Sequence, residues 1–451
     1  MDTGDTAWVL TSAALVLLMT PGLALFYGGM VRSKSVLNMM MMSFSALAVV
    51  TVLWVLYGYS MAFGDDVAGG LVGNPADFIG LKGLMDPGAL VFTVPSLAFV
   101  GFQAVFAIIT VALISGAIAD RARFVPWLLF AAVWATVVYF PVAHWVFAFD
   151  GVTGVDFSGG WIANNLKALD FAGGTAVHIN AGAAGLALAL VLGRRKGFGK
   201  EAMRPHNLPL VMIGAGLLWF GWFGFNAGSA VGANVFAAVA WVNTLSATAA
   251  AMIGWLVVEQ IRDGRPTSLG AASGIVAGLV AITPAAAALN PVGSLALGLV
   301  AGALCALAVG LKYRLGYDDS LDVVGVHLVG GLWGTIGIGL FATASAPAAV
   351  DGLFYGGGVD QLWRQVVGAG AVLAFSFVAT TIIGVAISRT IGFRIDEELE
   401  VEGIDAAEHA ESGYDFTSSG GGSLGLTSGH LATSARPASP TSPSSKEGAN
   451  A

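Results

Sequence analysis

The chain has 451 residues, of which 56% are hydrophobic and only 11% are charged, and its mean hydropathy is +0.79. Soluble domains carry about a quarter charged residues, so this composition excludes an ordinary water-soluble protein and indicates a membrane protein. The net charge of −8 comes from the end of the chain, because residues 1–394 hold 18 basic and 18 acidic residues whereas residues 395–451 hold 2 and 10. We expect no nucleic-acid partner, since no basic stripe is available to neutralise phosphates.

Other classes of site are also excluded by the residue content. The single cysteine, Cys305, lies in an apolar run, which rules out a disulfide framework and a cysteine-based metal site. A nucleophile, a base and an orienting group are not recognisable together. We therefore predict that the chain is not an enzyme and that it needs neither a metal nor a cofactor.

Intervals without charged residues predict the membrane spans. A helix needs about 20 residues to cross ~30 Å of hydrocarbon, and seven intervals fit one helix each: 6–31, 35–64, 87–119, 124–149, 171–193, 323–350 and 365–388. Two longer intervals, 205–258 and 266–311, contain turn signals near 228–234 and 284–291 and are interpreted as two helices each. The prediction is an all-α polytopic membrane protein with eleven transmembrane helices.

The basic residues predict the orientation of these helices. With the N-terminus outside, 15 basic residues fall in inner loops, whereas the outer loops hold only Lys82, Lys167 and Arg364. The positive-inside rule therefore places the N-terminus outside and the C-terminus inside. The first apolar stretch is too long for the apolar core of a signal peptide and has no basic residues before it, so we interpret it as the first span.

A short motif occurs twice and predicts an inverted repeat. Residues 176–185 read Ala-Val-His-Ile-Asn-Ala-Gly-Ala-Ala-Gly, and residues 325–334 read Gly-Val-His-Leu-Val-Gly-Gly-Leu-Trp-Gly. The two helices run in opposite directions in the predicted topology, as an inverted repeat requires. The helices then divide into two repeats of five, at about 7–193 and 209–345, and one extra helix at about 365–391. Together they form a transmembrane domain of residues 1–392.

The motif places His178 and His327 at equivalent positions. Ionisable side chains at membrane depth are costly and are usually functional. A pair of neutral imidazoles offers one donor and one acceptor in an apolar tube, which suits a small polar molecule or a proton rather than a hydrated ion. The alternative is that each histidine makes one structural hydrogen bond. For His144, which has no repeat partner, that structural role is our interpretation.

Two carboxylates precede the repeated helices. Asp170 begins the first of them, where it is expected to cap exposed N–H groups and to favour a cation at the outer mouth. Asp322 is assigned the matching position before the second helix. Rings also alternate with small or amide residues in 222–229 and 102–106. Such rings can hold a small cation with ~1–2 kcal/mol of cation–π energy, although on composition alone core packing is the preferred interpretation.

At this point several motifs, in order, resemble those of the ammonium transporter (Amt/MEP/Rh) family in its bacterial branch. They cover roughly residues 7–415, about 90% of the chain, and comprise Leu-Phe-Tyr-Gly-Gly at 25–29, residues 170–180, 221–229, 278–284, 322–327 and 392–409. The resemblance implies that His178 and His327 are the twin histidines of a pore. It also implies that Phe106 and Phe225 are the stacked rings of an outer gate, with Trp222 lining the pore below them.

The same resemblance implies an external recruitment site for ammonium, which it assigns to Phe106, Phe147, Ser229 and Asp170. Many bacterial relatives place a tryptophan where this chain has Phe147. Phenylalanine offers a weaker cation–π face and no N–H, so we expect weaker binding of ammonium. Trp145 is not expected to compensate, because positions i and i+2 point to different faces of a helix.

The implied mechanism is that ammonium gives up its proton at the gate, since an unpaired ion is too costly in an apolar tube. Ammonia then passes the histidines, and the proton follows separately, which would make transport electrogenic. Two alternatives stay open. One is an ammonium sensor that acts through a PII-type signalling protein, and the other is an electroneutral channel for ammonia or carbon dioxide.

The end of the chain is predicted to be cytoplasmic. Residues 393–416 are acidic and are most simply interpreted as solvated, whereas the resemblance implies a regulatory segment that packs under a homotrimer in the cell membrane. It also implies a PII-type partner at this face, although the family often has glycine where this chain has Ala410. Residues 417–451 are rich in serine, glycine and proline and are predicted to be disordered.

Overall fold

The structure is a computed structural model, and it describes residues 1–414. Within these residues, eleven helical segments are long and apolar enough to cross a membrane, which confirms the predicted number. The segments are Thr3–Met30, Val36–Phe63, Ser96–Ile118, Phe124–Phe147, Gly174–Leu192, Leu208–Gly228, Val235–Asp263, Ser268–Ala285, Pro291–Leu315, Val324–Phe341 and Asp360–Thr390. The predicted disordered tail at 417–451 lies outside the described residues.

Four spans, Thr3–Met30, Leu208–Gly228, Val235–Asp263 and Asp360–Thr390, are single α-helices, and the other seven are built from two or three helical elements. The elements of the spans are α1 (Thr3–Met30), α2 (Val36–Leu53), η1 (Trp54–Gly58), α3 (Tyr59–Phe63), α4 (Ser96–Ile114), η3 (Ser115–Ile118), α5 (Phe124–Trp134), η4 (Ala135–Tyr139), α6 (Phe140–Phe147), η6 (Gly174–Ile179), α7 (Asn180–Leu192), α8 (Leu208–Gly228), α9 (Val235–Asp263), α10 (Ser268–Ile282), η7 (Thr283–Ala285), α11 (Pro291–Ala308), α12 (Leu311–Leu315), η8 (Val324–Leu328), α13 (Val329–Phe341) and α14 (Asp360–Thr390). Of these, η1, η4, η6 and η8 are π-helical.

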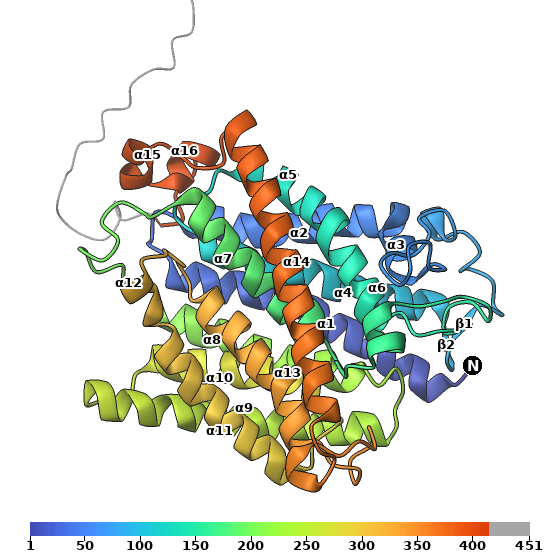
Figure 1. Cartoon of the computed structure of the whole chain (residues 1–451). Coiled ribbons are helices and arrows are strands. Elements are labelled where there is room, and N and C mark those ends of the chain that lie inside the picture. Colours follow the sequence, from blue (N-terminus) through green and yellow to red (C-terminus); the bar gives the residue numbers. More distant parts are fainter. Residues whose placement is uncertain (415–451) are drawn as a thin grey trace, which may run out of the picture. The chain divides into compact units, whose positions relative to one another are not determined.

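The remaining elements are short and lie between or after the spans. They are η2 (Ile79–Leu81), β1 (Leu90–Val91), β2 (Val94–Pro95), η5 (Ile162–Leu166), η9 (Leu353–Tyr355), α15 (Glu397–Glu402) and α16 (Ile404–His409). Strands β1 and β2 form an antiparallel hairpin in which Leu90 lies opposite Pro95. Figure 1 shows α15 and α16 at one end of the bundle and the N-terminus, β1 and β2 at the other end. We name the first end the tail face and the second the cavity face.

Capping residues explain where the helices of the second half begin. The side chains of Asn207, Asn234, Thr267 and Asn290 each accept a hydrogen bond from a backbone N–H in the first turn of the helix that follows. These four caps satisfy donors that have no partner inside a helix. The caps therefore mark the starts of α8, α9, α10 and α11. For α9 and α11, which begin inside the two long charge-free intervals, the absence of charge had given no starting residue.

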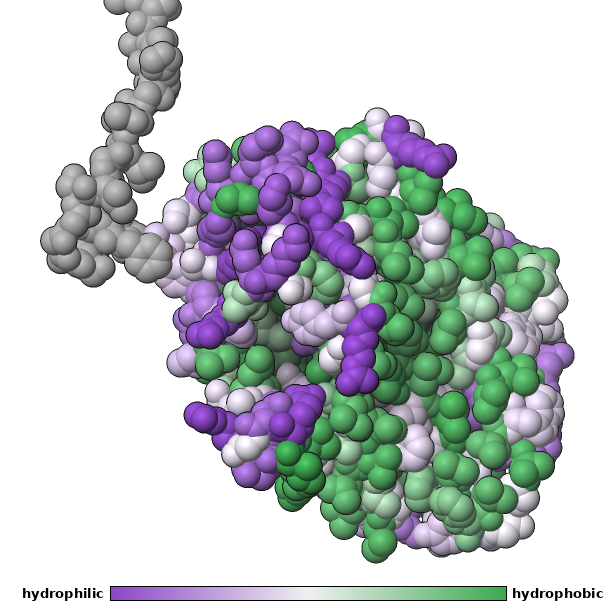
Figure 2. Space-filling view, turned by 60° about the vertical axis from the view of Figure 1, so that its left-hand side comes forward, coloured by the Kyte–Doolittle hydropathy of each residue, from purple (hydrophilic) through white to green (hydrophobic). Residues whose placement is uncertain are grey.

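The spans differ in how much of their surface is covered. In α4, in the η6–α7 span and in α10, 83% of the most apolar window is buried, compared with 28% in α14. Helix α14 runs across α7 and α13 on the outside of the bundle (Figure 1). On the face drawn in Figure 2, hydrophilic residues gather at one end and apolar residues cover most of the rest. A polar path lined by these three buried spans is therefore shielded from lipid.

The acidic segment packs against the tail face, and the expectation that it is solvated is wrong for its central residues. Glu400 and Asp405 are 1% and 2% exposed. The Asp405 carboxylate accepts from the backbone N–H groups of Leu37 (3.0 Å) and Asn38 (2.8 Å) in the first turn of α2. Burial raises the pKa of Asp405 above its ordinary value, although these bonds act to lower it. Asp405 therefore caps α2, although it lies about 370 residues further along the sequence.

Two further acidic side chains make similar contacts. Glu408 accepts from the backbone N–H of Phe124 at the start of α5 (2.9 Å). Glu400 accepts from the backbone N–H of Lys196 (2.7 Å) and from the Arg394 guanidinium (2.8 Å). Helix α16 ends at His409, and the residue that caps it, Ala410, has a φ of +54°. A left-handed conformation favours glycine, so alanine is strained at this position.

A buried ion cluster joins the loops of the tail face beneath this segment. Arg195 contacts Asp120 (3.0 Å) and Asp318 (2.9 Å), and all three side chains are almost fully buried. Burial acts to raise the pKa of Asp318, but its hydrogen bonds to Arg195 and the positive charge of Arg195 together hold that pKa below its ordinary value. The cluster fixes the ends of α4, α7 and α12 relative to one another.

Candidate functional site

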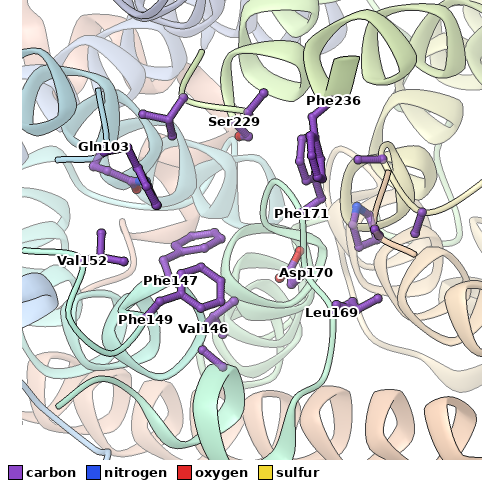
Figure 3. Close-up of a pocket in the computed structure, with 18 of the residues that line it drawn as sticks. Gln103, Val146, Phe147, Phe149, Val152, Leu169, Asp170, Phe171, Ser229 and Phe236 are labelled. Carbon is purple, nitrogen blue, oxygen red and sulfur yellow. The ribbon is translucent and has the colours of Figure 1, made fainter. Parts of the chain in front are cut away.

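A cavity of about 440 Å³ opens at the cavity face. Its lining includes Gln103 and Phe106 from α4, Phe147 from α6, Asp170 before η6, and Ser229 after α8. Figure 3 shows Gln103, Phe147, Asp170 and Ser229 around the same hollow. The structure thus brings together the four residues that the family resemblance assigns to recruitment, with Gln103 as an addition.

Asp170 has the capping geometry expected from the sequence. One carboxylate oxygen accepts from the backbone N–H groups of Gly173 (2.8 Å) and Gly174 (2.7 Å). The other accepts from the backbone N–H groups of Thr175 (2.8 Å) and Ala176 (3.2 Å) and from the Thr175 hydroxyl. Burial raises the pKa of Asp170, and these bonds act to lower it. Both oxygens are engaged by the protein, so Asp170 shapes the cavity and contributes its charge through the helix it caps.

The matching residue in the second repeat is Asp319, and the assignment of that position to Asp322 is wrong. Asp319 accepts from the backbone N–H groups of Val323 (3.1 Å) and Val324 (2.7 Å) at the start of η8. Asp322 instead pairs with Lys312 at 2.6 Å. Asp170 and Asp319 each lie eight residues before a histidine of the repeat. This common spacing was the signal in the sequence that identifies the pair.

Two phenylalanine rings lie between the cavity and the interior. The rings of Phe106 and Phe225 are 4.1 Å apart between centroids and inclined by 32°. Both side chains are buried, at 1% and 0% exposed. Phe106 lines the large cavity, whereas Phe225 lines a second cavity of about 10 Å³. The ring pair therefore separates the two cavities.

The second cavity is lined by His178, His327 and Trp222 among apolar side chains. The Nδ1 atoms of the two histidines are 3.3 Å apart, so one ring donates to the other. Trp222 stacks on His178 with centroids 5.4 Å apart, and its indole N–H donates to the Thr283 hydroxyl at 2.8 Å. The Nε2 atom of His178 is buried and makes no hydrogen bond to any described residue.

The histidines lie on π-helical turns, which recur at functional sites because they reorient side chains within a helix. Such turns were not predicted from the sequence. Each histidine is followed four residues later by a glycine that contacts the other repeat. A Cβ atom at Gly182 would lie 2.5 Å from the backbone nitrogen of Leu328, and one at Gly331 would lie 3.1 Å from the Cβ of His178. The two glycines thus make reciprocal contacts, which explains why the motif contains them.

Ser229 faces the cavity as an acceptor. Its hydroxyl donates to the carbonyl of Phe225 at 2.8 Å, which commits its single hydrogen and leaves its lone pairs free. Phe147 presents its ring to the cavity. Trp145 points elsewhere, as predicted, because its indole N–H donates to the carbonyl of Leu71 at 2.8 Å.

The third histidine within a span makes structural contacts. The Nδ1 atom of His144 lies 3.0 Å from the carbonyl oxygen of Ala62, and its Nε2 atom lies 3.5 Å from Asp66. Both ring nitrogens therefore face oxygen atoms at the end of the second span, which agrees with a structural role. Among residues 1–414, no group of three or more His, Cys, Asp or Glu side chains could hold a metal ion.

Buried polar groups reached through a ring gate, in a bundle of eleven spanning helices, are typical of a membrane transport protein. Comparison with known families refines this class. The model of the Ammonium Transporter Family matches residues 7–414. The chain belongs to this family, as the resemblance of its motifs predicted.

Individual relatives agree with this assignment. The chain is 63% identical over 444 residues to an ammonium transporter of Mycobacterium tuberculosis, covering 94% of this chain and 92% of the relative. It is 49% identical over 419 residues to that of Bacillus subtilis, covering 92% and 99%. Among solved structures, Candida albicans Mep2 matches with a TM-score of 0.79 and 36% identity, covering 88% and 87%. A protein described as a sensor Amt protein matches with a TM-score of 0.82 and 29% identity, covering 90% and 98%.

Proposed function

We propose that this chain captures ammonium in the 440 Å³ cavity, removes its proton at the Phe106–Phe225 gate and conducts ammonia past His178 and His327, while the proton crosses separately. The observation that carries the proposal is the histidine pair directly behind a closed pair of rings. Family membership supports ammonium as the substrate.

The sizes of the two cavities favour deprotonation at the gate. The inner cavity of about 10 Å³ has room for about one water-sized molecule. An ion that enters it leaves its hydration shell behind, and in an apolar space this costs several kcal/mol that no carboxylate of the lining offsets. Ammonia avoids the cost because it is neutral, and it is small enough for the space.

The histidine geometry favours a separate path for the proton. One imidazole already donates to the other through the Nδ1 atoms, and the Nε2 of His178 makes no hydrogen bond within residues 1–414. A proton that arrives at one end of such a pair can leave from the other end after the shared hydrogen bond reverses. Transport is then electrogenic, because ammonia and the proton both cross.

We further propose that the N-terminus is outside, that the tail face is cytoplasmic and that the chain works as a homotrimer in the cell membrane. The first two rest on the concentration of basic residues in the loops of the tail face. Large apolar side chains such as Val52, Phe220 and Ile253 are 54–58% exposed, which suits contact with lipid or with neighbouring subunits. A PII-type protein is the partner we propose at the tail face.

Recording charge movement in proteoliposomes after an ammonium pulse tests the mechanism. The parent protein is compared with His178→Ala, His327→Ala and the double variant. We expect a sustained current in the parent and none in the variants, while uptake of neutral methylamine persists. Current that persists unchanged in the double variant would show that the proton does not cross by way of the histidines.

The alternatives predict other results in the same experiment. An electroneutral ammonia or carbon dioxide channel gives uptake without current in the parent. A sensor gives neither, and the similarity to a solved sensor Amt protein is the observation that favours this second candidate. In that case, the tail face should bind a PII-type protein in an ammonium-dependent way.

A further inference from the structure

Gln103 is a polar residue of the cavity that the function described so far does not use. It lies on α4, one turn before Phe106, and its side chain is 8% exposed. It lines the 440 Å³ cavity, and Figure 3 shows it beside the same hollow as Ser229 and Phe147. Its amide makes no hydrogen bond to any of residues 1–414. The amide atoms are open to the cavity and not sealed in the core, so an entering ligand can reach them.

The other polar side chains of the lining are already engaged or carry the wrong charge. Both oxygens of Asp170 cap η6, and the side-chain oxygen of Asn234 caps α9. Lys167 is exposed and positive, so it repels a cation. Among the described lining residues, the free acceptors for a cation are therefore the Ser229 hydroxyl and the Gln103 amide oxygen.

Phe147 makes this acceptor available. Its ring offers a π face and no N–H, so it has no donor with which to occupy the amide oxygen of Gln103. Ammonium carries four N–H donors, and the lining offers the two side-chain oxygen acceptors, on Ser229 and Gln103, together with several phenylalanine rings, Phe106 and Phe147 among them. Oxygen acceptors and ring faces can therefore share the four donors.

We propose that Gln103 binds the ammonium ion directly, accepting a hydrogen bond through its amide oxygen, and that this contact offsets the weaker ring contact provided by Phe147. The inference rests on the proposed function, because it assigns a ligand to the same recruitment cavity. It names Gln103 as a specificity-determining residue for small cations that carry N–H donors.

The test is the concentration dependence of radiolabelled methylammonium uptake into proteoliposomes, with ammonium as the competitor. This assay reports binding whether or not charge moves. In Gln103→Leu, which keeps the bulk of the side chain and removes the acceptor, we expect KM and the ammonium inhibition constant to rise about tenfold, as for loss of a hydrogen bond to a charged group. The maximal rate should stay within about twofold of the parent.

Two further variants separate binding from structure. Gln103→Glu keeps an acceptor and adds a negative charge, so its KM should equal or fall below that of the parent. Val378→Ala changes an exposed apolar residue of α14 that does not line the cavity, and it should leave KM unchanged. Each variant is first checked for the parent elution volume in detergent, and a rise in KM at unchanged maximal rate in Gln103→Leu separates loss of the acceptor from a general packing defect.

The contrary results are equally specific. The inference is overturned if Gln103→Leu leaves KM within about twofold of the parent, or if Gln103→Leu and Gln103→Glu lower the maximal rate equally without a change in KM. Absence of saturable, ammonium-inhibited uptake in the parent would instead overturn the proposed function. The two failures are therefore distinguishable.

Discussion

The close contact of Gly182 with the second repeat leads to a sharp prediction for Gly182→Ala. The added Cβ would lie 2.5 Å from the backbone nitrogen of Leu328 and 2.7 Å from its Cα. Ordinary contact begins at 3.4 Å, so α7 and η8 must separate by about 0.9 Å at this point. Both nearest atoms belong to the backbone, so no side-chain rotation relieves the overlap.

The separation acts on the histidine pair as well as on stability. Overpacking costs about 1–3 kcal/mol, and we expect the upper part of this range because the neighbours are backbone atoms. Alanine regains up to about 1 kcal/mol of helix propensity over glycine, so the net loss is about 1–2 kcal/mol. The Nδ1–Nδ1 distance of 3.3 Å leaves only about 0.2 Å before the hydrogen bond is lost.

The assay measures unfolding in mixed micelles as SDS is added, together with ammonium-induced current in proteoliposomes. Gly370→Ala is the matched control, because a Cβ added at Gly370 of α14 would have no atom within 4 Å among the described residues. We expect Gly182→Ala to lower the unfolding free energy and to reduce the current at least tenfold. Gly370→Ala should be as stable as the parent or slightly more stable.

A Gly182→Ala protein with parent stability and parent current would refute this reasoning. It would mean that the repeats can move apart without disturbing the histidines. Loss of stability with full current would retain the packing argument and refute the link between the glycine contact and the path of the proton.

Three other predictions concern the two faces of the molecule. Arg195→Met leaves buried Asp318 without its paired cation and leaves Asp120 with Arg32 alone (3.4 Å), so SDS titration should show a loss of about 3–5 kcal/mol at pH 7. In the variant, burial raises the pKa of Asp318, so this carboxylate takes up a proton as pH falls and the difference between the two proteins should shrink towards pH 4. The parent loses the Asp318 contribution only at lower pH, as pH falls through its lowered pKa. Ala410→Gly relieves a φ of +54° and should stabilise docking of the acidic segment by about 1 kcal/mol, seen as slower proteolysis there. Lys167→Gln removes a positive charge at the cavity and should raise methylammonium uptake about twofold at low salt, as for a unit charge about 10 Å away in water, with no effect in 1 M salt.

The spans and the histidine positions could be predicted because each leaves a local record in the sequence. A helix that crosses lipid excludes charge over about 20 residues. The motif around His178 recurs around His327 because the two helices contact each other through equivalent glycines. Such requirements are met by neighbouring residues, so they are visible without a structure.

Other features depend on partners that are distant in sequence. Composition alone does not separate a carboxylate that caps a helix from one that faces water, and the partners of Asp405 lie at Leu37 and Asn38. Asp319 differs in this respect, because its eight-residue spacing to His327, equal to that of Asp170 to His178, was present in the sequence. Gln103 was visible within an aromatic run, but only the packed cavity identifies its amide as a group without a partner among residues 1–414.

The docking of the acidic segment has a consequence for how the chain is made. Helices α2 and α5 leave the ribosome early, yet the carboxylates that cap them, Asp405 and Glu408, are synthesised after the last span. The tail face is therefore completed only when translation has passed residue 408. A chain interrupted after residue 392 would insert all eleven spans and still present two open helix ends, a difference that quality-control proteases could detect.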